Sequence, residues 1–192
     1  MRVHLTIAAV LVCAAVTPAP GPPVVKASFS NTGALALAIP TSTTRAEIIN
    51  RARGWLAPSV PYSQDAFHTT PHGRYRTDCS GYVSMAWELP TAPYGGTSTQ
   101  GLASLADPVA KEDLRTGDAL IDAVGTNDTR HVALFDQWAD AARTEYWGYE
   151  QASGTGTVYR KIRYPYDSTP QDYRPYRRPN LARESGEPQW PS

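Results

Sequence analysis

The sequence YRTDCSGYVSMAWEL, residues 75–89, predicts a loop that runs into a helix beginning at Cys79. Asp78 is a favourable N-cap residue, because its carboxylate can accept hydrogen bonds from the free N–H groups of the first turn. Apolar side chains then recur at helical spacing, so one face of the helix is expected to be buried. These apolar residues are Cys79, Tyr82, Val83, Ala86 and Trp87.

Cys79 is expected in the first helical turn, among unpaired N–H groups and at the positive end of the helix dipole. Both favour the thiolate, which is the nucleophilic form of cysteine. The alternative is a small side chain that only fills a packing position. The cysteine count favours the nucleophile: the other cysteine, Cys13, lies in a predicted signal peptide, so the exported protein could form no internal disulfide.

Residues 1–27 are typical of a secretory signal peptide, with Arg2, an apolar run, and a small-residue cleavage site at 25–27. The apolar run is too short to span a bilayer comfortably, so no stable membrane insertion is expected after cleavage. We predict a flexible linker over 28–43, one catalytic domain over 44–178 and a disordered tail over 179–192.

The charge balance offers no support for nucleic-acid binding. The chain has 18 basic and 18 acidic residues, and removal of residues 1–27 takes away two of the basic ones. A near-neutral exported protein lacks the positive charge that attraction to phosphates requires. We therefore expect no nucleic-acid partner, and we expect a monomer.

Periodicity and turn residues predict helices followed by an antiparallel sheet, which is an α+β fold. Thr44 and Glu47 fit a capping box that starts a helix over about 44–57. Residues 63–76 are expected to form a polar loop, and residues 90–101 a Gly/Pro-rich loop that lines a cleft. Strands are expected over 119–122, 131–138, 144–152, 157–164 and 173–178.

A cysteine nucleophile requires a base, and the base requires a residue that orients its other nitrogen. His131 opens a predicted strand just after a turn, whereas His68 and His72 lie in a loop and are weaker candidates. The orienting residue is expected in the next strand, at Glu150 or Gln151. Because neighbouring strand residues point to opposite faces, only one of the two can face His131.

A zinc site is the rival interpretation of the same residues. His68 and His72, followed by Cys79, have a spacing that could ligate zinc. However, no fourth ligand is evident, and metal binding would suppress the nucleophile. We therefore predict no metal and no cofactor.

Three ordered segments closely resemble the NlpC/p60 family of cell-wall cysteine peptidases. They are Asp78–Val83 (DCSGYV), Leu114–Leu120 (LRTGDAL) and His131–Phe135 (HVALF). The resemblance extends over roughly residues 44–178. It implies a papain-like α+β fold, with N-terminal helices packed on a small antiparallel sheet, and metal-free hydrolysis of amide bonds in peptidoglycan stem peptides.

The resemblance also implies roles for individual residues. Cys79 would be the nucleophile, and His131 the general base and then the acid. Gln151, which precedes a small residue, matches the third position best, with Glu150 in reserve. The family's contacts to the substrate amine would fall on Tyr62, Asp78 and Ser80.

Taken together, the sequence predicts a secreted, cell-wall-associated endopeptidase that cleaves stem peptides through a Cys-His-polar triad. One alternative keeps the Cys-His pair but makes the protein an amidase or acyltransferase on another substrate. Another is an inactive papain-like module that binds the wall.

Overall fold

The computed structural model describes residues 42–182. The predicted signal peptide, nearly all of the predicted linker and most of the predicted tail lie outside the described residues. The described residues form an α+β fold, as predicted, with helices and a six-stranded antiparallel sheet.

Three α-helices, one short 3-10 helix (η1) and eight strands make up the described part of the chain. Their bounds are α1 Arg45–Arg53, β1 Phe67–Thr70, β2 Gly73–Arg76, α2 Cys79–Ala86, α3 Thr99–Leu105, β3 Asp107–Pro108, η1 Lys111–Asp113, β4 Ala119–Asp122, β5 His131–Trp138, β6 Glu145–Ala152, β7 Gly156–Arg163 and β8 Tyr173–Arg177. The large sheet has the order β3-β8-β4-β5-β6-β7, and β1 and β2 form a separate hairpin.

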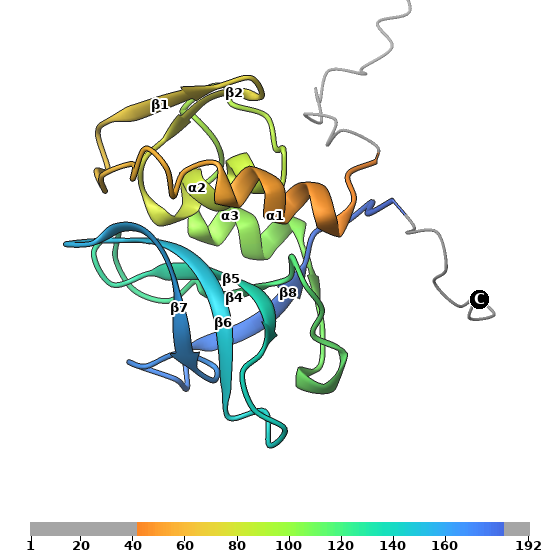
Figure 1. Ribbon diagram of the computed structural model, residues 1–192. Helices are drawn as coiled ribbons and strands as arrows, with labels where there is room; N and C mark the ends of the chain where they lie inside the picture. Colours follow the sequence, from red (N-terminus) through yellow and green to blue (C-terminus); the bar gives the residue numbers. More distant parts are fainter. Residues whose placement is uncertain (1–41, 183–192) are drawn as a thin grey trace, which may run out of the picture. The chain divides into compact units, whose positions relative to one another are not determined.

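Helix α2 packs against the sheet and against the other two α-helices. Figure 1 shows the three α-helices on one side of the sheet, with the β1–β2 hairpin beyond them. The sequence predicted one buried face for this helix, but all eight of its residues are buried. The reason is that α1, α3, the hairpin and strands β5 and β6 surround it.

Helix α1 begins as predicted and ends earlier than predicted. The Thr44 backbone N–H donates to Glu47 Oε2 at 2.7 Å, and the Glu47 N–H donates to Thr44 Oγ at 3.1 Å, which is the predicted capping box. Gly54 caps the helix, so residues 54–57 are turns rather than a fourth helical turn.

Two elements were not predicted. The segment expected as a polar loop, 63–76, contains the β1–β2 hairpin, and helix α3 begins inside the predicted Gly/Pro-rich loop. Ser98 caps α3 by accepting a hydrogen bond from the Gly101 N–H at 3.1 Å. Both elements are short and polar, so their sequences carry little periodicity.

The paired structure also extends beyond the predicted domain limits. Thr43, predicted in the linker, forms a bridge with Leu181, predicted in the tail. The Ala182 N–H donates to the Thr43 carbonyl at 2.9 Å. The two ends of the described chain are therefore joined by backbone hydrogen bonds.

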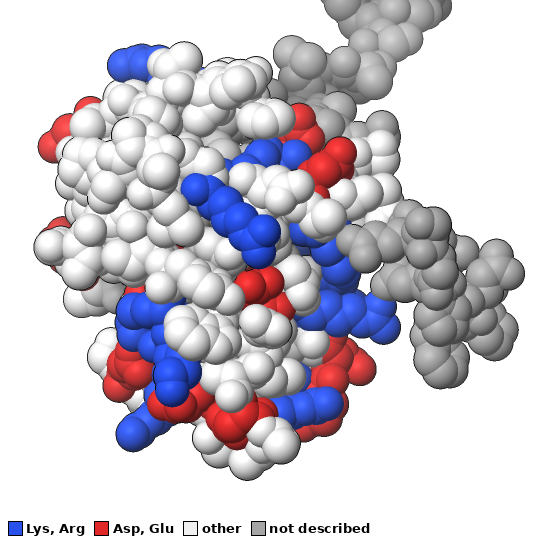
Figure 2. Space-filling model, viewed as in Figure 1, with Lys and Arg blue, Asp and Glu red and all other residues white. Residues whose placement is uncertain are grey.

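The surface in Figure 2 carries both charge signs. Lys, Arg, Asp and Glu side chains are interspersed over the sheet and along α1, whereas much of the area over the hairpin is uncharged in this view. Within residues 42–182, no helix combines the length and apolar character that crossing a bilayer requires.

Candidate active site

Cys79 is the first residue of α2, as the sequence predicted, and it is 6% exposed. Asp78 has an extended backbone and caps the helix, with its Oδ1 accepting from the Gly81 N–H at 2.5 Å. The thiol therefore sits beside the positive end of the helix dipole, where negative charge is stabilised.

His131 begins β5, and its interaction with Cys79 is one of the causes that raise its pKa. Its Nε2 is 2.8 Å from Glu150 Oε2. Because Nε2 is engaged by Glu150, Nδ1 is the ring nitrogen left for Cys79. A nucleophile, a base and an orienting carboxylate thus follow one another in space.

The charges of this group reinforce one another. Burial by itself lowers the pKa of His131, but hydrogen bonds to Cys79 and Glu150 outweigh it and raise the pKa to about 9. Burial by itself raises the pKa of Glu150, but the hydrogen bond and charge of His131 outweigh it and lower the pKa to about 2. At neutral pH the pair is therefore an imidazolium and a carboxylate.

Gln151, which the family resemblance favoured as the orienting residue, does not face His131. Its Nε2 donates to the carbonyls of Val60 at 3.1 Å and Thr77 at 3.0 Å, and its Oε1 accepts from Thr157. The register of β5 and β6 explains the difference. Ala133 lies opposite Glu150, so His131, two residues earlier, shares its face of the sheet, while Gln151 points to the other face.

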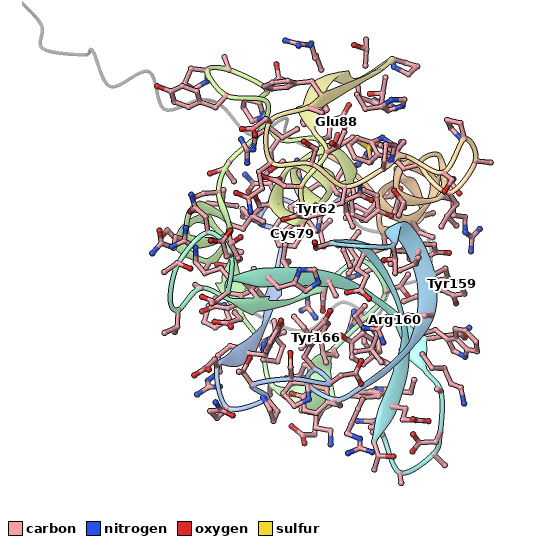
Figure 3. The ribbon with its side chains drawn as sticks, turned by 90° about the vertical axis from the view of Figure 1, so that its left-hand side faces the viewer. Tyr62, Cys79, Glu88, Tyr159, Arg160 and Tyr166 are labelled. Atoms are coloured by element: carbon pink, nitrogen blue, oxygen red, sulfur yellow. The ribbon has the colours of Figure 1, made fainter. Side chains whose placement is uncertain are left out.

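Two further residues, both missed by the sequence analysis, hold Glu150. The Tyr166 hydroxyl donates to the same Oε2 that His131 contacts, at 2.6 Å, and Arg160 Nε donates to Oε1. Arg160 also pairs with Asp167 at 2.6 Å. In Figure 3, Cys79 and Tyr62 lie at the junction of helices and sheet, with Arg160 of β7 and Tyr166 lower in the view.

One sequence signal could have found Arg160, and none could have found Tyr166. In an antiparallel pair, a Glu and an Arg on one face and two positions out of register are diagonal neighbours. Gly148 pairs with Arg160, which places Arg160 diagonal to Glu150. Tyr166 lies in the irregular segment between β7 and β8, and nothing in its local sequence points to Glu150.

A cavity of about 690 Å³ opens beside Cys79. The three residues expected to contact substrate, Tyr62, Asp78 and Ser80, all line it. The opposite wall comes from the Gly/Pro-rich loop, as predicted, together with the start of α3. Residues from that wall are Leu89, Pro90, Ala92, Pro93, Tyr94, Gly96, Thr97, Ser98 and Thr99.

The residues of the zinc alternative are not assembled. The His68 ring lies 5.2 Å from the Trp55 ring, and His72 Nδ1 lies 3.5 Å from a carboxylate oxygen of Glu88. Both histidines line a separate cavity of about 330 Å³ that does not include Cys79. Across residues 42–182, no three His, Cys, Asp or Glu side chains gather closely enough to hold a metal ion.

No protein-family model and no curated protein sequence matches this chain. Two NlpC/P60 family proteins are among the solved structures that are similar to it. One is an NlpC/p60 family protein from Bacillus cereus, with 21% identity and a TM-score of 0.47, matching 74% of this chain and 42% of that one. The other is described as similar to lipoprotein, of the NLP/P60 family, from Staphylococcus aureus, with 17% identity and a TM-score of 0.44, matching 69% and 40%.

This chain therefore spans less than half the length of those two structures. At TM-scores below 0.5 the likeness carries no functional assignment. What the site can do follows from its own residues: a thiol at a helix start, an imidazolium beside it, a carboxylate behind that, and a cavity that gives access to the thiol.

Proposed function

We propose that this protein is a papain-like cysteine endopeptidase of the NlpC/p60 type, which hydrolyses amide bonds in peptidoglycan stem peptides. The observation that carries the proposal is the His131–Glu150 pair, joined at 2.8 Å, together with a cysteine at a helix start that interacts with His131 and raises its pKa. The three sequence segments that resemble the family supply the substrate class.

In the proposed first step, the Cys79 thiolate attacks the carbonyl carbon of the scissile amide. The negative charge that develops on the carbonyl oxygen is met partly by the Cys79 backbone N–H at the start of α2. His131, present as the imidazolium, then gives its proton to the leaving amine. The amine departs and leaves an acyl group on the Cys79 sulfur.

In the second step, water replaces the amine. The neutral His131 removes a proton from water, and the resulting hydroxide attacks the thioester carbonyl. The carboxylic acid departs and Cys79 returns to the thiolate, with His131 again protonated. Glu150 holds the imidazole ring through Nε2 in both steps and stabilises its positive charge.

We also propose the cell wall as the location of this protein and stem peptides as its partner. Export through residues 1–27 would bring the domain to the cell wall, where stem peptides are its substrate. The three proposed catalytic residues, Cys79, His131 and Glu150, lie on α2, β5 and β6. We expect the 42–182 region to act without a metal or cofactor.

The test is digestion of purified bacterial peptidoglycan by the full chain after residue 27, with fragments identified by mass spectrometry. We expect new stem-peptide termini from the unmodified protein and none from Cys79→Ala, because loss of a covalent nucleophile abolishes acyl-enzyme formation. His72→Ala is the matched control, since His72 lines the other cavity, and it should retain activity.

Other outcomes would contradict the proposal in different ways. Equal release by the unmodified protein and Cys79→Ala would exclude a thiol mechanism. Absence of release by either protein under reducing conditions from pH 5 to pH 9, with wall binding retained, would favour the binding module instead.

A further inference from the structure

Arg76, the last residue of β2, is one of the residues that line the cavity beside Cys79. Its Nε donates to Asp78 Oδ2 at 2.8 Å, and its Nη2 donates to Ser80 Oγ at 3.1 Å. Three carbonyls of the opposite wall accept its remaining hydrogen bonds: Tyr94 at 2.6 Å, Gly96 at 3.0 Å and Thr97 at 3.0 Å. A guanidinium has five N–H donors, and five acceptors meet this one.

The Asp78 carboxylate is consequently engaged on both oxygens. Oδ2 faces the guanidinium, while Oδ1 accepts from the Gly81 N–H at 2.5 Å and from Ser80 Oγ at 3.2 Å. The Asp78 and Arg76 side chains are only 13% and 14% exposed, so water screens their ion pair weakly. The negative charge of Asp78 is therefore compensated within the protein.

This arrangement is unfavourable for a peptide with a free amino terminus. An ammonium donates three hydrogen bonds and requires a negative partner once it leaves water. Here Arg76 already donates hydrogen bonds to the Asp78 carboxylate, to the Ser80 hydroxyl and to three carbonyls of the cavity wall. The charged side chains that line the cavity also balance, with Asp65 and Asp78 against Arg76 and Arg130.

Other groups that line the cavity suit an uncharged amide. The Tyr62 oxygen accepts from Gln64 Nε2 at 3.4 Å, so its hydroxyl proton can be donated to a carbonyl oxygen. Burial raises the pKa of Tyr62, which keeps that proton in place at neutral and mildly alkaline pH. Apolar side chains nearby can pack against an acyl group: Leu89, Pro90, Ala92, Pro93 and Leu105.

We infer that this cleft binds stem peptides whose amino end is acylated, such as peptides still joined to the glycan, and rejects peptides with a free amino terminus. The inference rests on the proposed function and narrows its substrate class. Arg76 is the specificity-determining residue, because it replaces the ammonium that Asp78 and Ser80 were expected to bind.

The test compares two synthetic stem tripeptides that differ only at the amino end, one free and one N-acetylated. Binding to Cys79→Ala is measured by calorimetry, so the result does not depend on cleavage. We expect the acetylated peptide to bind at least tenfold more tightly. Equal affinity, tighter binding of the free peptide, or binding of neither peptide would overturn the inference.

A second comparison uses Arg76→Met in the Cys79→Ala background. Loss of the guanidinium exposes the charge of Asp78, so the preference for the acetylated peptide should disappear or reverse. Arg74→Met is the matched control, since Arg74 lies on the same strand and stacks on Phe67 at 4.1 Å, and it should leave the preference unchanged. A folded Arg76→Met with an unchanged preference would exclude Arg76 as the determinant.

These measurements separate the two proposals. If peptidoglycan digestion fails while Cys79→Ala binds the acetylated peptide, the catalytic proposal is wrong and the binding preference stands. If digestion succeeds and the two tripeptides bind equally, the peptidase proposal stands and the preference is wrong. If Arg76→Met does not fold, the tripeptide comparison alone decides.

Discussion

Glu150 is the buried carboxylate that contacts His131, and its polar partners explain how it stays ionised. Its side chain is buried, and one of its oxygens accepts from both His131 and Tyr166. Arg160 supplies a cation on the other oxygen. A buried carboxylate remains ionised only when such partners compensate the loss of water. Glu150 can therefore hold His131 in one orientation and in its charged form.

Replacement of Glu150 by Gln should lower both the pKa of His131 and the activity. The carboxylate is one of the two groups that raise the His131 pKa to about 9, so the midpoint of His131 titration, measured by NMR, should fall. The rate of peptidoglycan cleavage should fall on the order of 10²-fold, and its decrease on the alkaline side of the pH profile should begin at a lower pH. Glu145→Gln, on the same strand, is the control.

The same pair predicts how stability depends on pH. The pKa of Glu150 is about 2 in the folded protein, below its ordinary value of 4.5, so its contribution is complete above pH 4.5 and is lost as the pH falls towards 2. The pKa of His131 is about 9, above its ordinary value of 6.5, so its contribution is complete below pH 6.5 and is lost as the pH rises towards 9. The unfolding free energy of the Glu150→Gln variant, measured by denaturation, should lack the loss between pH 4.5 and pH 2. The same loss in the variant as in the unmodified protein would contradict this account.

At the scale of the element, the start of α2 is held by close packing against β2. A Cβ built on Gly81 would overlap the Arg76 carbonyl oxygen and would lie 2.8 Å from the Arg76 Cβ. No side-chain rotation can relieve a contact with backbone. Glycine at this position therefore allows the Asp78 cap, the Cys79 thiol and the Arg76 guanidinium to come together.

Gly81→Ala should destabilise the protein by about 1–3 kcal/mol, since the backbone of β2 must move to admit the methyl group. The midpoint of urea denaturation, followed by circular dichroism, measures this loss. Gly54→Ala is the control, because Gly54 already has helical backbone angles and should tolerate alanine with little change. A Gly81→Ala midpoint as high as that of Gly54→Ala would show that the contact is relieved at no cost.

At the scale of the whole molecule, Asp118 joins the first helix to the last strand. Its side chain is fully buried, and its oxygens lie 2.8 Å from Arg45 of α1 and 2.8 Å from Arg177 of β8. It also accepts from the Arg115 backbone N–H at 2.9 Å. The Leu-x-x-Gly-Asp turn thus links three parts of the chain that are far apart in sequence.

Asp118→Asn should therefore cost about 3 kcal/mol of unfolding free energy, as expected when one partner of a buried ion pair is removed. Thermal and urea denaturation measure the loss. Asp107→Asn, on an exposed residue of β3, is the matched control and should change stability by less than about 0.5 kcal/mol. A loss no larger than that of the control would mean that the two arginines are stabilised by other partners.

Local signals predicted the elements whose stabilising features lie within a few residues. The capping residue Asp78 and the apolar repeat after it were enough to begin a helix at Cys79. Strands β4 and β5 lie where alternation and turn residues placed them. Hairpin β1–β2 and helix α3 were missed because both are short, and their sequences carry little periodicity.

The sequence by itself determined which kinds of residue could carry the chemistry: a lone cysteine after the predicted signal peptide, a histidine that opens a strand, and two polar residues in the next strand. Alternation allowed only one of Glu150 and Gln151 to face His131, and the register between β5 and β6 decided for Glu150. Only the tertiary structure brought Tyr166 and Arg160 to that carboxylate and paired Arg76 with Asp78. The reason is that these contacts join side chains whose positions depend on the packing of separate elements.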